Sequence, residues 1–429
     1  MHSEQICHKT VLANGITVVS EEINHVRSVS IGIWVRSGSR YEQCGINGTA
    51  HFIEHMLFKG TERRSAFDIA SEIDSVGGMM NAFTGKELTS FYIKVPDYHL
   101  PMAIDLLADV FQNSRFQEEE IVKEQSVVLQ EISMVEDSPD DYIHDYFEEV
   151  FWNGHPLGLP VLGTKDQVTH LTRETLVSFF KERYTGGELV VAAAGRLNHD
   201  ILVELIRKAF SSIGQKTVET EIHPPDVSSK IAVLEKDLEQ VHMLIGTLAP
   251  SAVSPKRYTG FLLNAVLGGS MSSRLFQEIR EKRGLAYAIH SFLSPYMDTG
   301  FMGIYVGTGE EKILAVVDLI HDALKQFCDK LLTDKEMHAA KEMIKGNFLL
   351  SMESTDNRMT RLAKNEICFG KNIPPEDVMR RIDEVEKEGI RELASEMFGS
   401  DRLALVAIGR VAKEELASTW HPKSSEALS

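Results

Sequence analysis

The residues best suited to chemistry lie near the start of the chain, where His51, Glu54 and His55 fall within five positions. On a helix, residues four apart share a face with their Cβ atoms about 5–6 Å apart, so both imidazoles can reach one metal ion. Imidazole suits Zn²⁺, and a catalytic zinc site keeps three protein ligands with a water in the remaining position. Glu54 stands beside the pair, where a carboxylate can act as general base for that water.

The same spacing could arise by chance on a solvated helix face. The neighbouring residues argue against this, because they are apolar: Ala50, Phe52, Ile53, Met56, Leu57 and Phe58. A helix with such neighbours is expected to be buried on most of its surface, and buried polar side chains need partners. We therefore interpret the run as part of a metal site.

A third ligand has to come from elsewhere in the chain, and residues 118–136 offer two candidates. This stretch has a helical pattern of apolar residues, and its Glu124 and Glu131 are seven apart and so lie on one face. Either could be the ligand. Since surface glutamates are the norm, the pattern by itself favours two solvent-facing acids, and it leaves the third ligand open.

The elements that must position these side chains are strands and helices in mixed order. Alternation at period two predicts strands at 17–20, 28–35 and 91–95. Helical patterns are predicted at 48–58, 66–76, 98–112, 118–136, 255–267, 273–283, 311–328 and 333–351. This mixture predicts an α+β fold with helices packed on one face of mostly antiparallel sheets.

One pattern occurs twice along the chain. The apolar run 189–195, which ends in Gly195, returns about half the chain later as 403–409, which ends in Gly409. A polar stretch rich in Pro, Ser and Gly lies between the two copies and is typical of a linker. We therefore predict two homologous halves, residues 1–215 and 230–429, joined by a linker at 216–229.

Composition sets limits on the function. The chain has 429 residues, of which 43% are hydrophobic and 25% charged, as in ordinary globular proteins of two or more domains. A net charge of −18 argues against nucleic-acid binding and favours cationic or neutral ligands. Four scattered cysteines, no membrane-spanning run and no targeting segment at the N-terminus predict a cytoplasmic protein.

The motif residues together resemble the pitrilysin and insulinase family of zinc metallopeptidases, the inverted zincins. The resemblance rests on His51 and His55 around Glu54, followed 80 residues after His51 by Glu131 with Glu124 seven residues earlier. It is strongest to the branch with the mitochondrial processing peptidase β subunit and bacterial processing-protease-like proteins. It implies that His51, His55 and Glu131 bind one zinc, that Glu54 is the general base and that Glu124 supports catalysis from behind the ligands.

Two further segments resemble the same family. Residues 273–287 are similar to a signature of the second half, which implies substrate binding by Arg280 and transition-state stabilisation by Tyr287. Without the family, this pair is more typical of packing. Residues 77–84 are similar to an edge strand near the zinc, which implies that Asn81, Ala82 and Phe83 bind an extended peptide. A plain hairpin rim is the alternative.

The resemblance implies a zinc-dependent endopeptidase whose two halves close like a clamshell around an acidic chamber. It implies cleavage of unfolded peptides or presequences by zinc-activated water. Residues 261–267 of the second half are apolar and hold no ligands, so the first half is expected to bind the single zinc ion and the second to supply substrate-binding residues. Family members of this length act as dimers, so a homodimer or a pair with a similar chain is expected, in a bacterial cytoplasm, with basic peptides preferred.

Two rival functions follow from the same residues. Relatives of this fold serve as noncatalytic structural or scaffold subunits, but such subunits generally lose motif residues, and this chain keeps the whole set. A zinc hydrolase that acts on another amide is the second rival. The edge-strand segment favours peptides over other amides.

Overall fold

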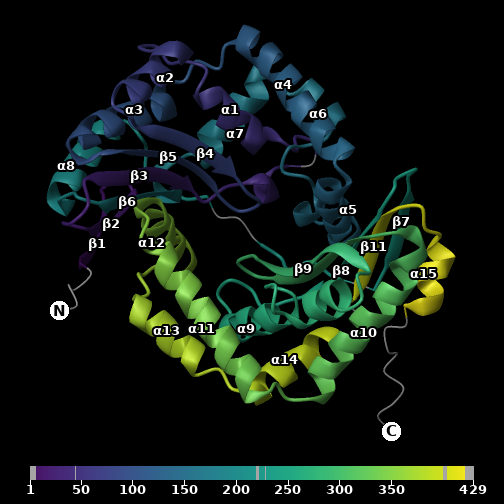
Figure 1. The fold of residues 1–429 in the computed structure, drawn as a ribbon. Coiled ribbons are helices and arrows are strands. Elements are labelled where there is room, and N and C mark those ends of the chain that lie inside the picture. Colours follow the sequence, from purple (N-terminus) through teal and green to yellow (C-terminus); the bar gives the residue numbers. More distant parts are fainter. Residues whose placement is uncertain (1–5, 44, 219–221, 228, 400–402, 421–429) are drawn as a thin grey trace. The chain divides into compact units, whose positions relative to one another are not determined.

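The computed structural model describes residues 6–43, 45–218, 222–227, 229–399 and 403–420 (Figure 1). Outside the described residues lie 1–5, on which the prediction of no targeting segment rests, Cys44, and positions 219–221 and 228 of the predicted linker. No helix within the described ranges is long and apolar enough to cross a bilayer.

The chain forms two compact units. Unit 1 comprises Met1–Met134, Leu159–Glu221 and Leu350–Asn372, and unit 2 comprises Val135–Gly158, Ile222–Leu349 and Ile373–Ser429. Each unit therefore takes most of its residues from one half of the chain and a short segment from the other half. The division of the chain into two homologous halves, with boundaries at residues 215 and 230, remains a prediction.

Unit 1 is built on a six-stranded sheet in the order β1-β2-β6-β3-β5-β4. Its strands are β1 (Ile6–Val11), β2 (Thr17–Glu22), β3 (Ser28–Val35), β4 (Met79–Thr84), β5 (Thr89–Pro96) and β6 (Leu189–Gly195). The β2–β6 pair is parallel and the other neighbouring pairs are antiparallel. Strand β4 forms one edge of this sheet, as predicted for residues 77–84.

Successive strand residues point to opposite faces of this sheet, and helices pack on the apolar side chains of those faces. The helices of unit 1 are α1 (Thr49–Leu57), α2 (Ala66–Ser75), α3 (Leu100–Asn113), α4 (Glu118–Asp137), α6 (Lys165–His170), α7 (Arg173–Arg183), α8 (His199–Ala209) and α12 (Thr355–Phe369). Ile31 and Ile33 of β3 pack with Phe52 of α1 and Leu107 of α3 in the main core. This core fixes α1 rigidly on the sheet.

Unit 2 has a five-stranded sheet in the order β7-β11-β8-β10-β9. Its strands are β7 (Ile231–Glu235), β8 (Val241–Leu248), β9 (Ala286–Pro295), β10 (Gly300–Thr308) and β11 (Ala404–Gly409). Its helices are α5 (Pro139–Trp152), α9 (Arg257–Leu267), α10 (Ile313–Asp329), α11 (Asp334–Ser351), α13 (Pro375–Asp383), α14 (Lys387–Phe398) and α15 (Lys413–Thr419). The predicted helix at 273–283 is a π-helical turn, Phe276–Glu281.

The two sheets repeat one topology, which confirms the predicted α+β fold of two similar halves. Strand β11 pairs in parallel with β7 and antiparallel with β8, as β6 pairs with β2 and β3. The corresponding strands β6 and β11 each end in a glycine with positive φ, 135° at Gly195 and 138° at Gly409. The Gly195 turn passes so close to Ser28 that an added Cβ would lie 2.3 Å from its carbonyl oxygen, which explains the glycine.

The second face of each sheet is covered by a helix from the other half of the chain. In unit 1, Met359 and Leu362 of α12 pack on Trp34 and Val190, on the face opposite α3 (Figure 1). In unit 2, Phe147 of α5 occupies the corresponding place and packs with the buried residues Leu244, Phe301 and Val406. Sheets are therefore covered on both faces, whereas the sequence predicted helices on one face.

Candidate metal centre

Helix α1 carries the His51, Glu54 and His55 motif and begins at a strained position. Gly48, its N-cap, has φ of 94°, and a Cβ there would lie 2.7 Å from the carbonyl oxygen of Leu162. Only glycine fits both this conformation and this close approach. The fixed start of the helix fixes the direction in which its third, sixth and seventh residues point.

A buried carboxylate anchors this helix start. Glu42 accepts hydrogen bonds from the backbone N–H groups of Gly48 (2.9 Å) and Ala50 (2.7 Å) and from the side-chain amide of Asn47 (2.9 Å). The two backbone donors are groups that a helix N-terminus leaves unpaired. Burial raises the pKa of Glu42 to about 7, although the three hydrogen bonds oppose that rise. Glu42 therefore positions the motif helix.

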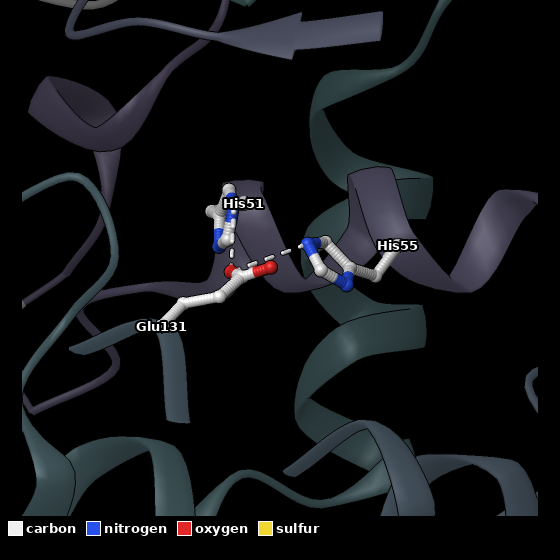
Figure 2. Close-up of side chains that lie close together, drawn as sticks. All are labelled: His51, His55 and Glu131. Carbon is white, nitrogen blue, oxygen red and sulfur yellow. Dashed lines mark ion pairs between the residues drawn. The ribbon is translucent and has the colours of Figure 1, made fainter. Parts of the chain in front are cut away.

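The two imidazoles and Glu131 converge on one point in unit 1 (Figure 2). The Nε2 atoms of His51 and His55 lie 3.8 Å and 3.7 Å from the same carboxylate oxygen, Oε2 of Glu131. The imidazole rings meet edge to face with their centroids 4.6 Å apart. The ligand atoms of the three residues all lie within 4.8 Å of one another, and no other such group exists among the described residues.

This donor set fits zinc. A tetrahedral zinc ion with bonds of about 2.0–2.1 Å holds its donor atoms about 3.4 Å apart, close to the separations of 3.7 and 3.8 Å found here. Two imidazoles and one carboxylate are a known ligand combination of catalytic zinc sites. The described residues also give the buried Nδ1 of His51 no hydrogen-bond partner.

Burial keeps one of the imidazoles available as a ligand. Burial, together with a smaller effect of the neighbouring His55, lowers the pKa of His51 to about 4. The ring is therefore neutral at pH 7 and keeps a nitrogen lone pair, which metal binding requires.

Glu124 lies behind His55 and orients it. Its Oε2 is 2.9 Å from Nδ1 of His55, and its side chain is only 5% exposed. A carboxylate in this position makes Nδ1 the protonated nitrogen and leaves Nε2 free to bind metal. The sequence alone did not decide which of the two glutamates is the third ligand, and the structure separates them. Glu131 faces the Nε2 atoms of His51 and His55, and Glu124 faces Nδ1 of His55.

Glu54 lies on the same helix and is held by the edge strand. The hydroxyl of Thr84, the last residue of β4, donates a 2.5 Å hydrogen bond to Oε2 of Glu54. Burial raises the pKa of Glu54, and the hydrogen bond from Thr84 opposes this rise. A carboxyl group whose pKa is moved towards neutrality is better suited to proton transfer at pH 7.

The family resemblance implies that Glu54 is the general base of peptide cleavage, and on that expectation Thr84→Val should shift the pH dependence of cleavage. The hydroxyl stabilises the ionised form of Glu54, so its loss raises the pKa of Glu54 further. Since a base must be ionised to act, we expect the acidic limb of kcat/KM to move to higher pH. The matched control is Thr89→Val, which removes a buried hydroxyl bonded to the Ser37 carbonyl and should leave that limb in place. An unmoved limb in both variants would contradict the role of Thr84.

The edge-strand residues Asn81, Ala82 and Phe83 lie one to three positions before Thr84. Asn81 and Phe83 are exposed on one side of β4, and Ala82 faces the core with Thr84. Within the described sheet β4 pairs with β5 alone. Its outer edge therefore offers backbone groups to which an extended peptide can add as a strand, while the N–H of Ala82 donates to Oδ1 of Asn81 at 2.8 Å in this structure.

Arg280 and Tyr287 lie in unit 2, so the site formed by unit 1 includes neither. The guanidinium of Arg280 lies over the rings of Phe276 (4.8 Å) and Tyr287 (5.7 Å). Tyr287, on β9, is 77% exposed. The π-helical turn that carries Arg280 is a form often found at functional sites.

Unit 2 has no counterpart of the metal site within the described residues. Helix α9 follows β8 as α1 follows β3, but its inward positions are Leu262, Leu263 and Val266. One zinc site per chain is therefore the count that the described residues support.

Neither Glu42 nor Thr84 was predicted from the sequence as a residue of this site. Glu42 belongs to no recognisable spacing, because it approaches α1 through a loop. Thr84 had a usable signal: it alternates with Met80 and Ala82 and so points to the same side of the edge strand.

Comparison with known proteins identifies zinc proteases among the relatives of this chain. The model of Insulinase (Peptidase family M16) matches residues 17–165, and the model of the Peptidase M16 inactive domain matches residues 170–344. The uncharacterized zinc protease YmxG of Bacillus subtilis is 40% identical over 92% of this chain and 96% of its own length. An uncharacterized zinc protease of Streptomyces coelicolor is 38% identical over 98% of this chain and 93% of its own length. Zn²⁺ is accordingly the cofactor that the site has to accommodate.

Solved structures share the fold. A protease from Helicobacter pylori superimposes with a TM-score of 0.88 at 23% identity, covering 94% of this chain and 99% of its own. A peptidase M16 inactive domain from Pseudomonas fluorescens gives the same TM-score at 20% identity, with coverages of 95% and 98%. Together with the extent of the sequence matches, these findings establish that the chain belongs to the insulinase family of peptidases, family M16.

Proposed function

We propose that this chain is a zinc-dependent endopeptidase that cleaves unfolded peptides or presequences. The observation that carries the proposal is the convergence of His51, His55 and Glu131 beside Glu54, at the end of an open edge strand. We assign the three converging residues as zinc ligands. A noncatalytic scaffold role has no observation of its own in its favour, since this donor set is complete.

Each residue has a role in hydrolysis. Zn²⁺, when bound, acidifies water and polarises the carbonyl of the scissile peptide bond. Glu54 takes the proton of the attacking water and passes it to the leaving amine. Thr84 holds the Glu54 carboxylate in place, and Glu124 holds His55. The product termini then form without covalent attachment to the chain.

The substrate adds as a strand to β4 in this proposal. Asn81, Ala82 and Phe83 bind the extended peptide, which pairs with the outward-facing backbone groups of this segment, and such pairing gives affinity with little sequence selectivity. Arg280 binds a substrate carbonyl or carboxylate, and Tyr287 stabilises the oxyanion of the transition state. The resemblance to processing peptidases supports these two roles and an enclosed chamber that excludes folded proteins. Dimerisation and a cytoplasmic location belong to the same proposal.

Zinc removal should abolish cleavage reversibly. Treatment with a strong chelator is expected to stop cleavage of unstructured peptides, and one equivalent of Zn²⁺ should restore it. Zinc at 100 times its dissociation constant should also stabilise the folded protein by about 2.7 kcal/mol, because it binds the folded state alone. Peptide cleavage and thermal unfolding are followed on the same samples. Undiminished cleavage by protein shown to be free of metal would contradict the proposal.

Basic peptides should be preferred at low salt. The net charge of −18 attracts cationic substrates, and salt screens that attraction over about 10 Å at 0.1 M. Two peptides with one cleavage segment, flanked by lysines or by glutamates, are compared through kcat/KM. We expect the lysine peptide to be cut faster, with the difference shrinking as salt rises. Equal rates at low salt would refute the preference.

A further inference from the structure

The carboxylate behind the metal site has a second partner. Glu124 uses one oxygen, Oε2, for Nδ1 of His55 at 2.9 Å, and the other, Oε1, for the ammonium of Lys59 at 2.6 Å. Lys59 lies just beyond α1, where its backbone N–H donates to the carbonyl of Met56 at 3.1 Å. A row of contacts therefore runs from Lys59 through Glu124 to His55.

The burial of Glu124 makes its ion pair with Lys59 important. The Glu124 side chain is 5% exposed, whereas Lys59 is 31% exposed and reaches it from the surface. A buried carboxylate is stable only when it is paired and its oxygens are hydrogen-bonded. With His55 alone as partner, one oxygen of Glu124 would lose its contact, and the carboxylate could rotate away from Nδ1.

We propose that Lys59 is a positioning residue of the zinc site, which fixes Glu124 and through it the orientation of His55. This inference rests on the proposed function, in which His55 is a zinc ligand. Among the described residues, the ammonium of Lys59 forms its ion pair with Glu124 and none with the proposed ligand Glu131. Residues that bond directly to a metal ligand, as Glu124 does, typically change metal affinity by 10- to 100-fold when removed, and Lys59 acts through such a residue.

A purely structural role is the competing explanation. Lys59 lies two residues beyond Leu57, the last residue of α1, and a cation near a helix C-terminus stabilises the helix by itself. That explanation predicts lower thermal stability without a change in the zinc affinity of the folded protein. The two explanations therefore differ in a measurement that does not depend on activity.

The test measures zinc affinity of the full-length protein by competition with a chromophoric chelator. Lys59→Met should raise the zinc dissociation constant about tenfold. The matched control is Lys94→Met. Lys94 lies on β5 of the unit 1 sheet, is 33% exposed and forms a 2.9 Å ion pair with Asp356 of α12. We expect Lys94→Met to bind zinc as tightly as the unchanged protein. Lys59→Gln serves as a second variant.

A double-mutant cycle tests whether Lys59 acts through Glu124. In the Glu124→Gln background, adding Lys59→Met should change the zinc dissociation constant by less than about twofold, because the mediating carboxylate is gone. Equal zinc affinity in Lys59→Met, Lys94→Met and the unchanged protein would overturn the inference about Lys59 alone. Unchanged zinc affinity in His55→Ala would instead overturn the proposed zinc site.

Discussion

His55→Ala should bind zinc far more weakly than the unchanged protein and should show no measurable peptide cleavage at stoichiometric zinc. Nε2 of His55 is one of three donor atoms that converge on the site, and the described residues offer no replacement within 4.8 Å. Losing a direct ligand should cost more than the 10- to 100-fold that loss of a residue behind the ligands typically costs. Bound zinc is measured by elemental analysis after dialysis against buffered free Zn²⁺.

His199→Ala is the matched control for this experiment. His199 is also buried in unit 1. Its two ring nitrogens form hydrogen bonds with the hydroxyls of Thr10 and Ser20, and it lies far from the motif in the sequence. We expect this variant to lose stability and to retain one zinc per chain. If His55→Ala kept its zinc as firmly as His199→Ala, the assignment of the ligands would be wrong.

Glu54→Gln should retain zinc and lose cleavage. Glu54 contributes no donor atom to the converging group, so its amide should leave the metal affinity nearly unchanged. Glutamine cannot accept the proton of the attacking water, and loss of a general base typically slows a reaction by about 10²- to 10⁴-fold. Both kcat and bound zinc are measured on one preparation.

The control for Glu54→Gln is Glu119→Gln, which makes the same change at an exposed position in the first turn of α4. This variant should cleave at the normal rate. A Glu54→Gln protein with its full complement of zinc and a nearly normal kcat would mean that another group accepts the proton.

The sequence was most informative where the signal is local. His51 and His55 share a helix, so a spacing of four places them on one face whatever the rest of the fold does. The spacing of seven between Glu124 and Glu131 likewise placed both on one face of α4. It could not assign their separate contacts, because these depend on how α4 approaches α1, and only the family resemblance distinguished them.

Long-range features were not predictable from periodicity. Helices α5 and α12 each cover the sheet of the other half of the chain, and a helical pattern does not specify the sheet on which a helix packs. The contact between Glu54 and Thr84 spans 30 residues and depends on the edge position of β4. The repeat, in contrast, was visible in the sequence, and apart from β1 the strands of the first sheet follow the same order as the five strands of the second.

We propose that this chain cleaves peptides with Glu54 as base at a zinc site formed by His51, His55 and Glu131. The most direct test of this proposal is mass-spectrometric mapping of cuts in a mixed library of unstructured peptides, with zinc-loaded protein beside zinc-loaded Glu54→Gln. We predict many cuts by the unchanged protein and none by the variant, at equal metal content. Identical cuts by both, or no cuts by fully metallated protein in any oligomeric state, would contradict the account.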